Sequence, residues 1–149
     1  MLKSWFPNVR ALFTTNGVDT DRFRPMDSEG RRSFRSALGI PSERPAVLMV
    51  ARESDKKNVS SIMAIPRDKF TLVTCGAVRK PEHSDIRELG IVPHSQMPAV
   101  YASADILVHA AEGEGFPLAV QEAMASGIAV LLRKDEGYGE AVPSHALLE

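Results

Sequence analysis

Short apolar runs that alternate with helical segments most constrain the fold of this 149-residue chain. The helical segments expected from apolar spacing and end signals cover residues 28–38, 57–65, 95–103 and 117–126. The apolar runs have the length and flanking turn residues of buried strands, and they cover residues 45–52, 69–76, 86–89, 105–109 and 128–133. Strands that alternate with helices predict an α/β layered domain with a mainly parallel sheet.

Several chemically interesting residues follow the carboxyl ends of these runs. Arg52 ends the first strand, Gly76 ends the second, and Glu114 lies past the run over 105–109. Ligands of open parallel sheets bind outside the carboxyl ends of the strands. We therefore expect these residues to meet at one edge of the sheet.

The segment from Glu114 to Gly127 predicts a buried helix with a single charge. Pro117 suits the first helical position, and Gly127 suits the residue after the last turn. Glu122 is the only charged residue within the helix, and a buried carboxylate needs a partner. A ligand hydroxyl, an arginine, or an exposed position at the helix edge would each satisfy it.

The start of this helix predicts an anion site. Gly115 and Phe116 offer backbone N–H groups next to a helix N-terminus, which carries free donors and a partial positive charge. Glu114 borders the same place, and its carboxylate would repel a phosphate. Its expected target is therefore neutral and hydroxylated, such as a sugar ring.

The stretch from Glu114 to Glu122 resembles the Glu-x7-Glu motif of family-4 (group 1) glycosyltransferases, which have the two-domain GT-B architecture. Further matches follow in the family's order, at Asn16–Pro25, Val47–Arg52, Lys57–Asn58, Tyr101–Asp105, and Gly137 with Glu140. The resemblance spans nearly the whole chain. It implies the C-terminal, Rossmann-like half of a GT-B fold. Residues 1–25 would be an entry or interdomain segment, and residues 26–149 a nucleotide-sugar-binding domain truncated at its C-terminus.

The resemblance also implies roles for individual residues. Arg52 and Lys57 would neutralise the diphosphate as it leaves, and Glu114 would contact hydroxyls of the donor sugar, which makes these three the expected catalytic residues. The expected donor-binding residues are Gly115, Phe116 and Pro117 at the phosphate, Glu122 at the ribose hydroxyls, and Leu89 and Gly90 near the base. No metal cofactor is expected, because the basic pair supplies the positive charge. The histidines show no metal-site spacing, and His109 is expected to hydrogen-bond locally.

The family's reaction is the retaining transfer of a hexosyl group from a nucleotide-sugar donor to an acceptor. The expected partners are the donor and a missing N-terminal domain that carries the acceptor site, so the isolated chain is expected to be inactive. The alternative is a non-catalytic nucleotide-sugar-binding or interaction module of the same fold. Two departures motivate it: Ala51 replaces the usual glycine, and the connection over 77–84 is short for a parallel crossover. That crossover is either irregular, or the strand pairing differs. A sugar phosphorylase or a nucleotide-sugar epimerase is a third reading.

Composition excludes several other classes. The net charge is −1, and the basic cluster Arg31, Arg32 and Arg35 is expected on a solvated helix face, so no nucleic-acid partner is predicted. No apolar run is long enough to span a membrane. The expected location is the cytoplasm, with any peripheral membrane contact through the missing domain. Cys75 is the single cysteine and predicts a core thiol, and the sequon Asn58–Ser60 is interpreted as chance.

Overall fold

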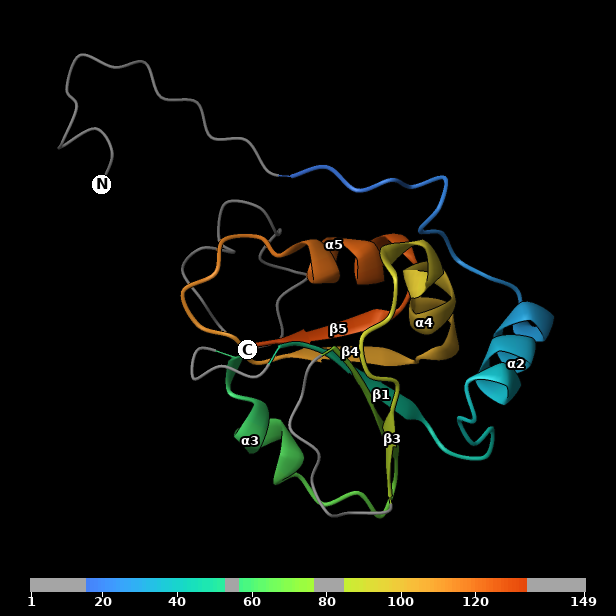
Figure 1. Cartoon of the computed structure of the whole chain (residues 1–149), viewed down its shortest axis with the longest axis horizontal. Helices are drawn as coiled ribbons and strands as arrows, with labels where there is room; N and C mark the ends of the chain where they lie inside the picture. Colours follow the sequence, from blue (N-terminus) through green and yellow to red (C-terminus); the bar gives the residue numbers. More distant parts are fainter. Residues whose placement is uncertain (1–15, 53–56, 77–84, 134–149) are drawn as a thin grey trace, which may run out of the picture.

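The computed structural model describes residues 16–52, 57–76 and 85–133 of the chain. Within these residues a five-stranded sheet has the order β3-β2-β1-β4-β5, and every pairing is parallel (Figure 1). The strands are β1 (Ala46–Val50), β2 (Thr71–Cys75), β3 (Ile86–Glu88), β4 (Ile106–His109) and β5 (Ala129–Leu132). The predicted α/β class with a parallel sheet is confirmed.

Helices cover both faces of the sheet. They are α2 (Ser28–Ala37), α3 (Val59–Met63), α4 (Met97–Ser103) with a preceding 3-10 turn η2 (His94–Gln96), and α5 (Leu118–Ala125). Helix α3 lies on one face, α4 and α5 lie on the other, and α2 packs on the outer side of α4 (Figure 1).

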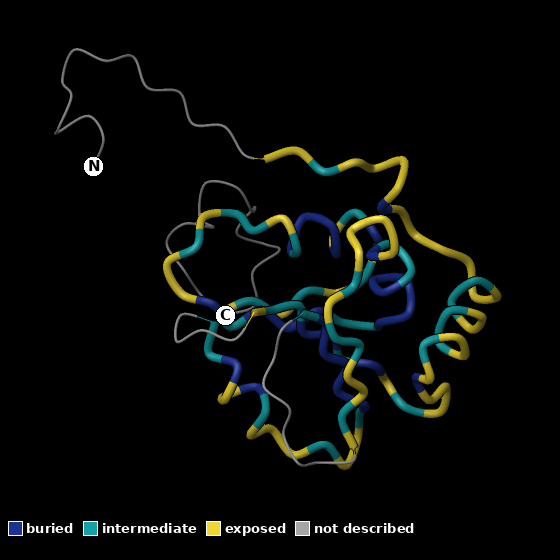
Figure 2. Tube along the Cα trace, viewed as in Figure 1, coloured by how far each residue is buried: buried dark blue, intermediate teal, exposed yellow. Residues whose placement is uncertain are grey.

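The strands divide their side chains between two apolar cores, because successive side chains of a strand point to opposite faces. In β1, Leu48 faces the core under α4 and α5, whereas Met49 faces the core under α3. Tyr101 of α4 and Phe23 are completely or almost completely buried in the first core. Burial is therefore concentrated between the sheet and α4 and α5 (Figure 2).

Two predicted details of the elements are corrected. Pro117 is the N-cap of α5 and not its first residue, because its ψ of 143° is extended. Strand β3 pairs parallel with β2, which rules out the alternative of a different strand pairing, and the connection over 77–84 lies outside the described residues. Gly127, at a φ of 73°, ends α5 as predicted.

Of the basic cluster of α2, Arg32 is exposed as predicted, but Arg31 and Arg35 pack against the domain, contrary to the prediction. Arg31 Nη2 donates to Asp105 Oδ1 at 2.7 Å, and Arg35 pairs with Asp105 Oδ2. The same guanidinium groups also donate to carbonyls at the end of α4, including that of Ser103 at 2.8 Å from Arg35 Nε. Asp105 also accepts from the backbone N–H of Ala46 at 2.7 Å. One carboxylate therefore ties α2 to β1 and to the start of β4.

Candidate functional site

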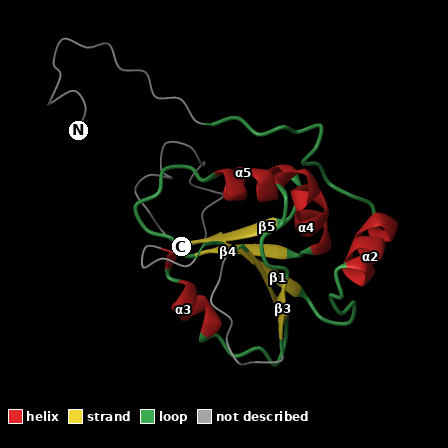
Figure 3. Ribbon diagram, in the orientation of Figure 1, coloured by secondary structure: helices red, strands yellow, loops and turns green. Residues whose placement is uncertain are grey.

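A pocket of about 730 Å³ lies at the carboxyl ends of β1, β2 and β4. The connections that follow β1 and β4 run to opposite sides of the sheet, toward β2 and toward β5, so the two neighbouring strands form a topological switch point. The loop between β4 and α5 (Figure 3) contributes the lining residues from Glu114 to Pro117. The lining residues are Asn16, Val50, Ala51, Arg52, Lys57, Cys75, Gly76, His109, Glu114, Gly115, Phe116, Pro117, Leu118 and Ala119.

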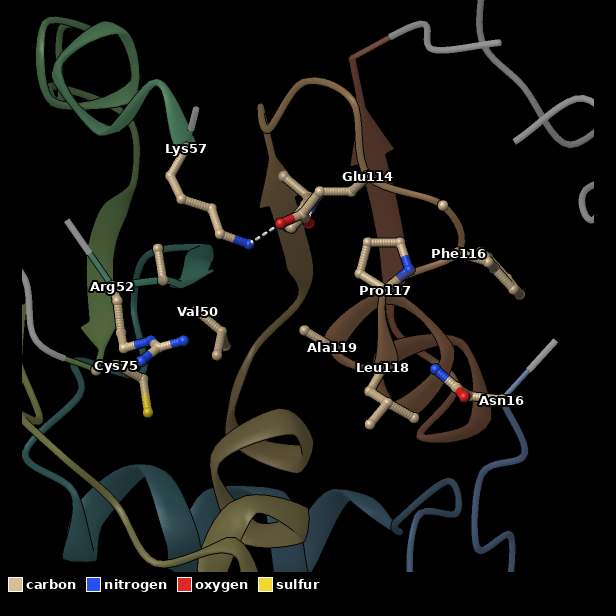
Figure 4. A pocket seen from close by; sticks show the side chains of 14 residues that line it. Asn16, Val50, Arg52, Lys57, Cys75, Glu114, Phe116, Pro117, Leu118 and Ala119 are labelled. Atoms are coloured by element: carbon tan, nitrogen blue, oxygen red, sulfur yellow. Dashed lines mark hydrogen bonds and ion pairs between the residues drawn. The ribbon is translucent and has the colours of Figure 1, made fainter. Parts of the chain in front are cut away.

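Two cations line the side of the pocket formed after β1. Arg52 follows the end of β1, and Lys57 lies just before α3. Lys57 Nζ forms an ion pair with Glu114 Oε1 on the opposite wall, and the two side chains point toward one another in Figure 4. In the described ranges, no acidic side chain pairs with Arg52. Its charge is therefore available to a ligand.

The N-terminus of α5 faces the same pocket. Pro117 is its N-cap and makes no side-chain capping hydrogen bond. The carbonyl of Pro117 accepts from Val120 and Gln121, whereas Leu118 and Ala119, which line the pocket, are first-turn residues whose N–H groups have no intrahelical acceptor. This uncapped end, with its partial positive charge, is suited to an anion.

Glu114 is held by two donors. Besides Lys57, His109 Nε2 lies 3.0 Å from Glu114 Oε2, and the imidazole is buried. Burial would raise the pKa of the Glu114 carboxyl, but the hydrogen bonds and charges of Lys57 and His109 outweigh it and lower that pKa. Burial lowers the pKa of His109 despite the carboxylate beside it. His109 is therefore neutral at pH 7, and its proton must be on Nε2, because a carboxylate only accepts.

Glu122 lies about one turn beyond Leu118 and Ala119 in α5, and it does not line the pocket. Its Oε2 accepts from the hydroxyl of Tyr101 at 2.8 Å, and its Oε1 lies 2.8 Å from His94 Nε2. The carboxylate is buried and Tyr101 is completely buried, whereas the side chain of His94 is 63% exposed. Two protein donors therefore satisfy the buried charge and connect α5 to α4.

Residues 30–146 match the family described as "Glycosyl transferases group 1". The chain belongs to the group 1 glycosyltransferases.

Curated relatives of this glycosyltransferase chain are longer than it is. A GDP-mannose-dependent alpha-mannosyltransferase of Mycolicibacterium smegmatis is 33% identical over 123 residues, which cover 77% of this chain and 32% of that protein. An N,N'-diacetylbacillosaminyl-diphospho-undecaprenol alpha-1,3-N-acetylgalactosaminyltransferase of Campylobacter jejuni is 30% identical over 149 residues, which cover 91% of this chain and 39% of that protein. The chain thus spans about a third to two fifths of the length of these two relatives.

Solved glycosyltransferase structures share its fold. Anabaena HepE in complex with UDP-glucose superposes with a TM-score of 0.71 at 21% identity, over 86% of this chain and 40% of that one. The C-terminal domain of the group 1 protein LpcC from Francisella tularensis gives a TM-score of 0.63 at 24% identity, over 86% of this chain and 76% of that one. The fold is that of one half of a GT-B glycosyltransferase.

The structure brings together most of the predicted site of this glycosyltransferase domain. The predicted residues that line the pocket are Arg52, Lys57, Glu114, Gly115, Phe116 and Pro117. Leu89 and Gly90 do not line it. Leu89 packs on the core under α4, and the carbonyl of Gly90 accepts from Gly76 N–H at 2.7 Å, which places Gly90 beside a pocket residue.

Sequence reasoning missed the partners of Glu122, because neither Tyr101 nor His94 was expected there. The local hydrogen bond expected of His109 is confirmed, and its partner is Glu114, five residues further along the chain. The strand-end position of His109 was a usable signal, whereas no spacing connects Glu122 with Tyr101 or His94. Gly137 and Glu140, which belong to the stated resemblance, lie outside the described residues.

The described ranges lack two features that would indicate other kinds of function. They hold no group of three or more His, Cys, Asp or Glu side chains that could ligate a metal ion. They also hold no helix that is long and apolar enough to cross a membrane.

We expect His109 to make the stability of this glycosyltransferase domain fall in mild acid. Its pKa is lower in the folded chain than its ordinary value of 6.5, so the unfolded chain binds more protons as the pH falls below that value, and folding weakens. His109→Gln keeps a donor for Glu114 but removes this titration. Urea unfolding between about pH 7 and pH 5 should therefore show a flatter pH dependence in the variant.

The depressed pKa of Glu114 adds a separate loss of stability. This loss begins as the pH falls below the ordinary carboxyl value of 4.5, and both proteins should show it. Equal slopes above about pH 5 in the two proteins would contradict the assignment of the first loss to His109.

Proposed function

We propose that this chain is the donor-binding domain of a retaining glycosyltransferase that moves a hexosyl group from a nucleoside diphosphate sugar to an acceptor. One observation carries the proposal. Arg52 and Lys57 face the uncapped N-terminus of α5 across a single pocket at the switch point of the sheet. Cations and free N–H donors that converge from two sides suit a diphosphate.

The pocket supports a division of roles. Arg52, which has no acidic partner among the described residues, and the first turn of α5 would hold the diphosphate. Lys57 would share its charge between the leaving phosphate and Glu114, so no metal ion is required in this proposal. Glu114, kept ionised by its two donors, has further lone pairs for the hydroxyls of the donor sugar.

Glu122 would serve the ribose in this proposal. It lies one turn beyond Ala119, which lines the pocket, and its carboxylate is positioned by Tyr101 and His94. A bound ribose hydroxyl would have to displace the exposed His94 from Glu122 or share the carboxylate with it, because Tyr101 is fully buried. Gly90, hydrogen-bonded to Gly76, would lie near the base.

The acceptor site is proposed to lie on another domain. The chain spans only part of its relatives. Likewise, it covers 40% of the neighbour of the same fold that is in complex with UDP-glucose. Transfer needs donor and acceptor to be held together in a reactive geometry. We therefore propose that the domain alone binds donor but transfers little sugar.

A nucleoside diphosphate should protect the chain against unfolding, and Arg52→Ala should remove most of this protection. At a ligand concentration about ten times the dissociation constant, the stabilisation is about 1.4 kcal/mol. Loss of a charge-assisted contact to phosphate should weaken binding about tenfold or more. Thermal unfolding with UDP, GDP and ADP measures both effects.

Arg24→Ala is the matched control, because Arg24 is exposed and does not line the pocket. Its protection should equal that of the wild-type chain. If none of the three nucleotides shifts the melting temperature at millimolar concentration, the proposed donor-binding role is wrong.

A non-catalytic nucleotide-sugar-binding module is the second candidate, and Ala51 favours it. Ala51 lines the pocket at a position where the resembled family has a glycine. Its methyl group would narrow the space through which a diphosphate approaches the backbone. Joining the chain to the N-terminal domain of a related enzyme would test this candidate. Nucleotide binding without sugar transfer, followed by transfer in the Ala51→Gly variant, would favour it.

A further inference from the structure

Asn58 has an unusual backbone conformation beside the candidate site. Its φ of 49° and ψ of 36° are left-handed, and no other non-glycine residue in the described ranges has a positive φ. L-residues with a side chain rarely adopt this conformation, although asparagine tolerates it better than most. Such strain persists where the surrounding structure imposes it, and it is common at functional sites.

The strained turn lies between the pocket and a helix. Asn58 is the N-cap of α3, and Lys57 directly precedes it. The left-handed residue joins Lys57, which lines the pocket, to α3, which packs against the sheet through Val59. The direction of the Lys57 side chain therefore depends on the backbone of Asn58.

The side chain of Asn58 reaches the segment that follows β4. Its Nδ2 donates to the carbonyl of Ala110 at 2.9 Å, and it lies 3.4 Å from Glu112 Oε1. Ala110 follows β4, in the loop that leads to Glu114. The amide thus connects the segment after β1 to the segment after β4, across the switch point.

We propose that Asn58 is a positioning residue for the Lys57–Glu114 pair. Its backbone turn directs Lys57, and its amide fixes the distance between the two segments that carry the ion pair. The catalytic consequence of this role depends on the proposed function, whereas the geometry itself does not.

Three variants separate the turn from the amide bond. Asn58→Gly keeps access to the left-handed conformation but removes the bond to Ala110, and Asn58→Ala loses both. Ser60→Ala is the matched control, because it destroys the sequon at an exposed position of α3 and leaves Asn58 intact.

The first measurement is an NMR titration that gives the pKa of the Glu114 carboxyl in the folded chain without nucleotide. We expect this pKa to rise toward its ordinary value in Asn58→Gly and further in Asn58→Ala, and to stay unchanged in Ser60→Ala. The readout does not depend on ligand binding and is taken only from folded protein. An unchanged Glu114 pKa in both Asn58 variants would overturn the proposal.

The second measurement is the affinity for UDP, GDP and ADP by calorimetry. The dissociation constant of the nucleotide that binds should rise roughly fivefold in Asn58→Gly, which corresponds to the loss of one hydrogen bond. It should rise further in Asn58→Ala, because the backbone strain is added. Failure of the wild-type chain to bind any nucleotide would refute the proposed function, but the Glu114 pKa would still test the role of Asn58.

Discussion

Replacing Asp105 by alanine is expected to lower the free energy of unfolding by about 3 kcal/mol, the largest loss of stability anticipated from one substitution. The variant leaves the Ala46 N–H, on a completely buried residue, without its acceptor. It also removes the carboxylate partner of Arg35, a guanidinium that is only 11% exposed. The value lies below that of a fully buried ion pair because Asp105 is 37% exposed and partly screened.

Urea or thermal unfolding would measure this loss, with a decrease in melting temperature of roughly 6 to 12 °C. Asp68→Ala provides the control, because Asp68 is exposed and has no hydrogen bond or ion pair within the described residues. Its free energy of unfolding should change by less than about 0.5 kcal/mol. Equal effects of the two substitutions would show that α2 is not held through Asp105.

Tyr101→Phe is expected to cost about 2 to 3 kcal/mol in the free energy of unfolding. The substitution removes a hydroxyl donor from Glu122, whose side chain is only 9% exposed, and leaves a charged oxygen under-satisfied. Burial first, and then the charge of Glu122, raise the pKa of Tyr101, so the hydroxyl stays a donor throughout the ordinary pH range. The exposed His94 cannot replace this donor.

A double-mutant cycle tests whether the cost comes from the unpaired carboxylate. Because replacing both partners by apolar groups removes the unsatisfied charge, Tyr101→Phe with Glu122→Leu should cost clearly less than the sum of the single variants. His94→Ala should cost less than about 1 kcal/mol, since that side chain is mostly exposed. Additive losses in the cycle would contradict the assignment.

The hydrogen bond between Tyr101 and Glu122 also affects the candidate site. Glu122 lies on α5 and Tyr101 on α4, so their hydrogen bond fixes α5 over the sheet. The N-terminus of α5 is the proposed phosphate cradle. We therefore expect Tyr101→Phe to weaken nucleotide binding as well as stability, although Tyr101 does not line the pocket.

Local sequence patterns predicted the elements and the edge of the sheet that carries the site. Apolar runs with flanking turn residues placed the strands within a few residues of their observed bounds. Arg52 and Glu114 were placed at strand ends, and the structure finds both at one pocket. The exception of Pro117 is small, because proline has the same φ as an N-cap and as a first helical residue, and only its ψ distinguishes the two.

The charged side chains were harder to place, because their partners are distant in the sequence. Arg31 and Arg35 meet Asp105 across about 70 residues, and Lys57 meets Glu114 across 57. Spacing along a helix shows which residues share a face, but not what that face meets. The prediction of a solvated face for Arg31 and Arg35 failed for this reason.

Residue order alone was enough to determine an alternating parallel α/β domain and the approximate ends of the helix over 117–126. It also placed a cation and a carboxylate at one edge of the sheet. Backbone preference and apolar periodicity act over neighbouring residues, so the sequence shows them directly. Only the tertiary structure decided that Lys57 pairs with Glu114, that Tyr101 and His94 hold Glu122, and that the amide of Asn58 connects the segment after β1 to the segment after β4. These contacts depend on which strands are neighbours and on how far side chains reach across the sheet, and chain folding sets both over long separations in sequence.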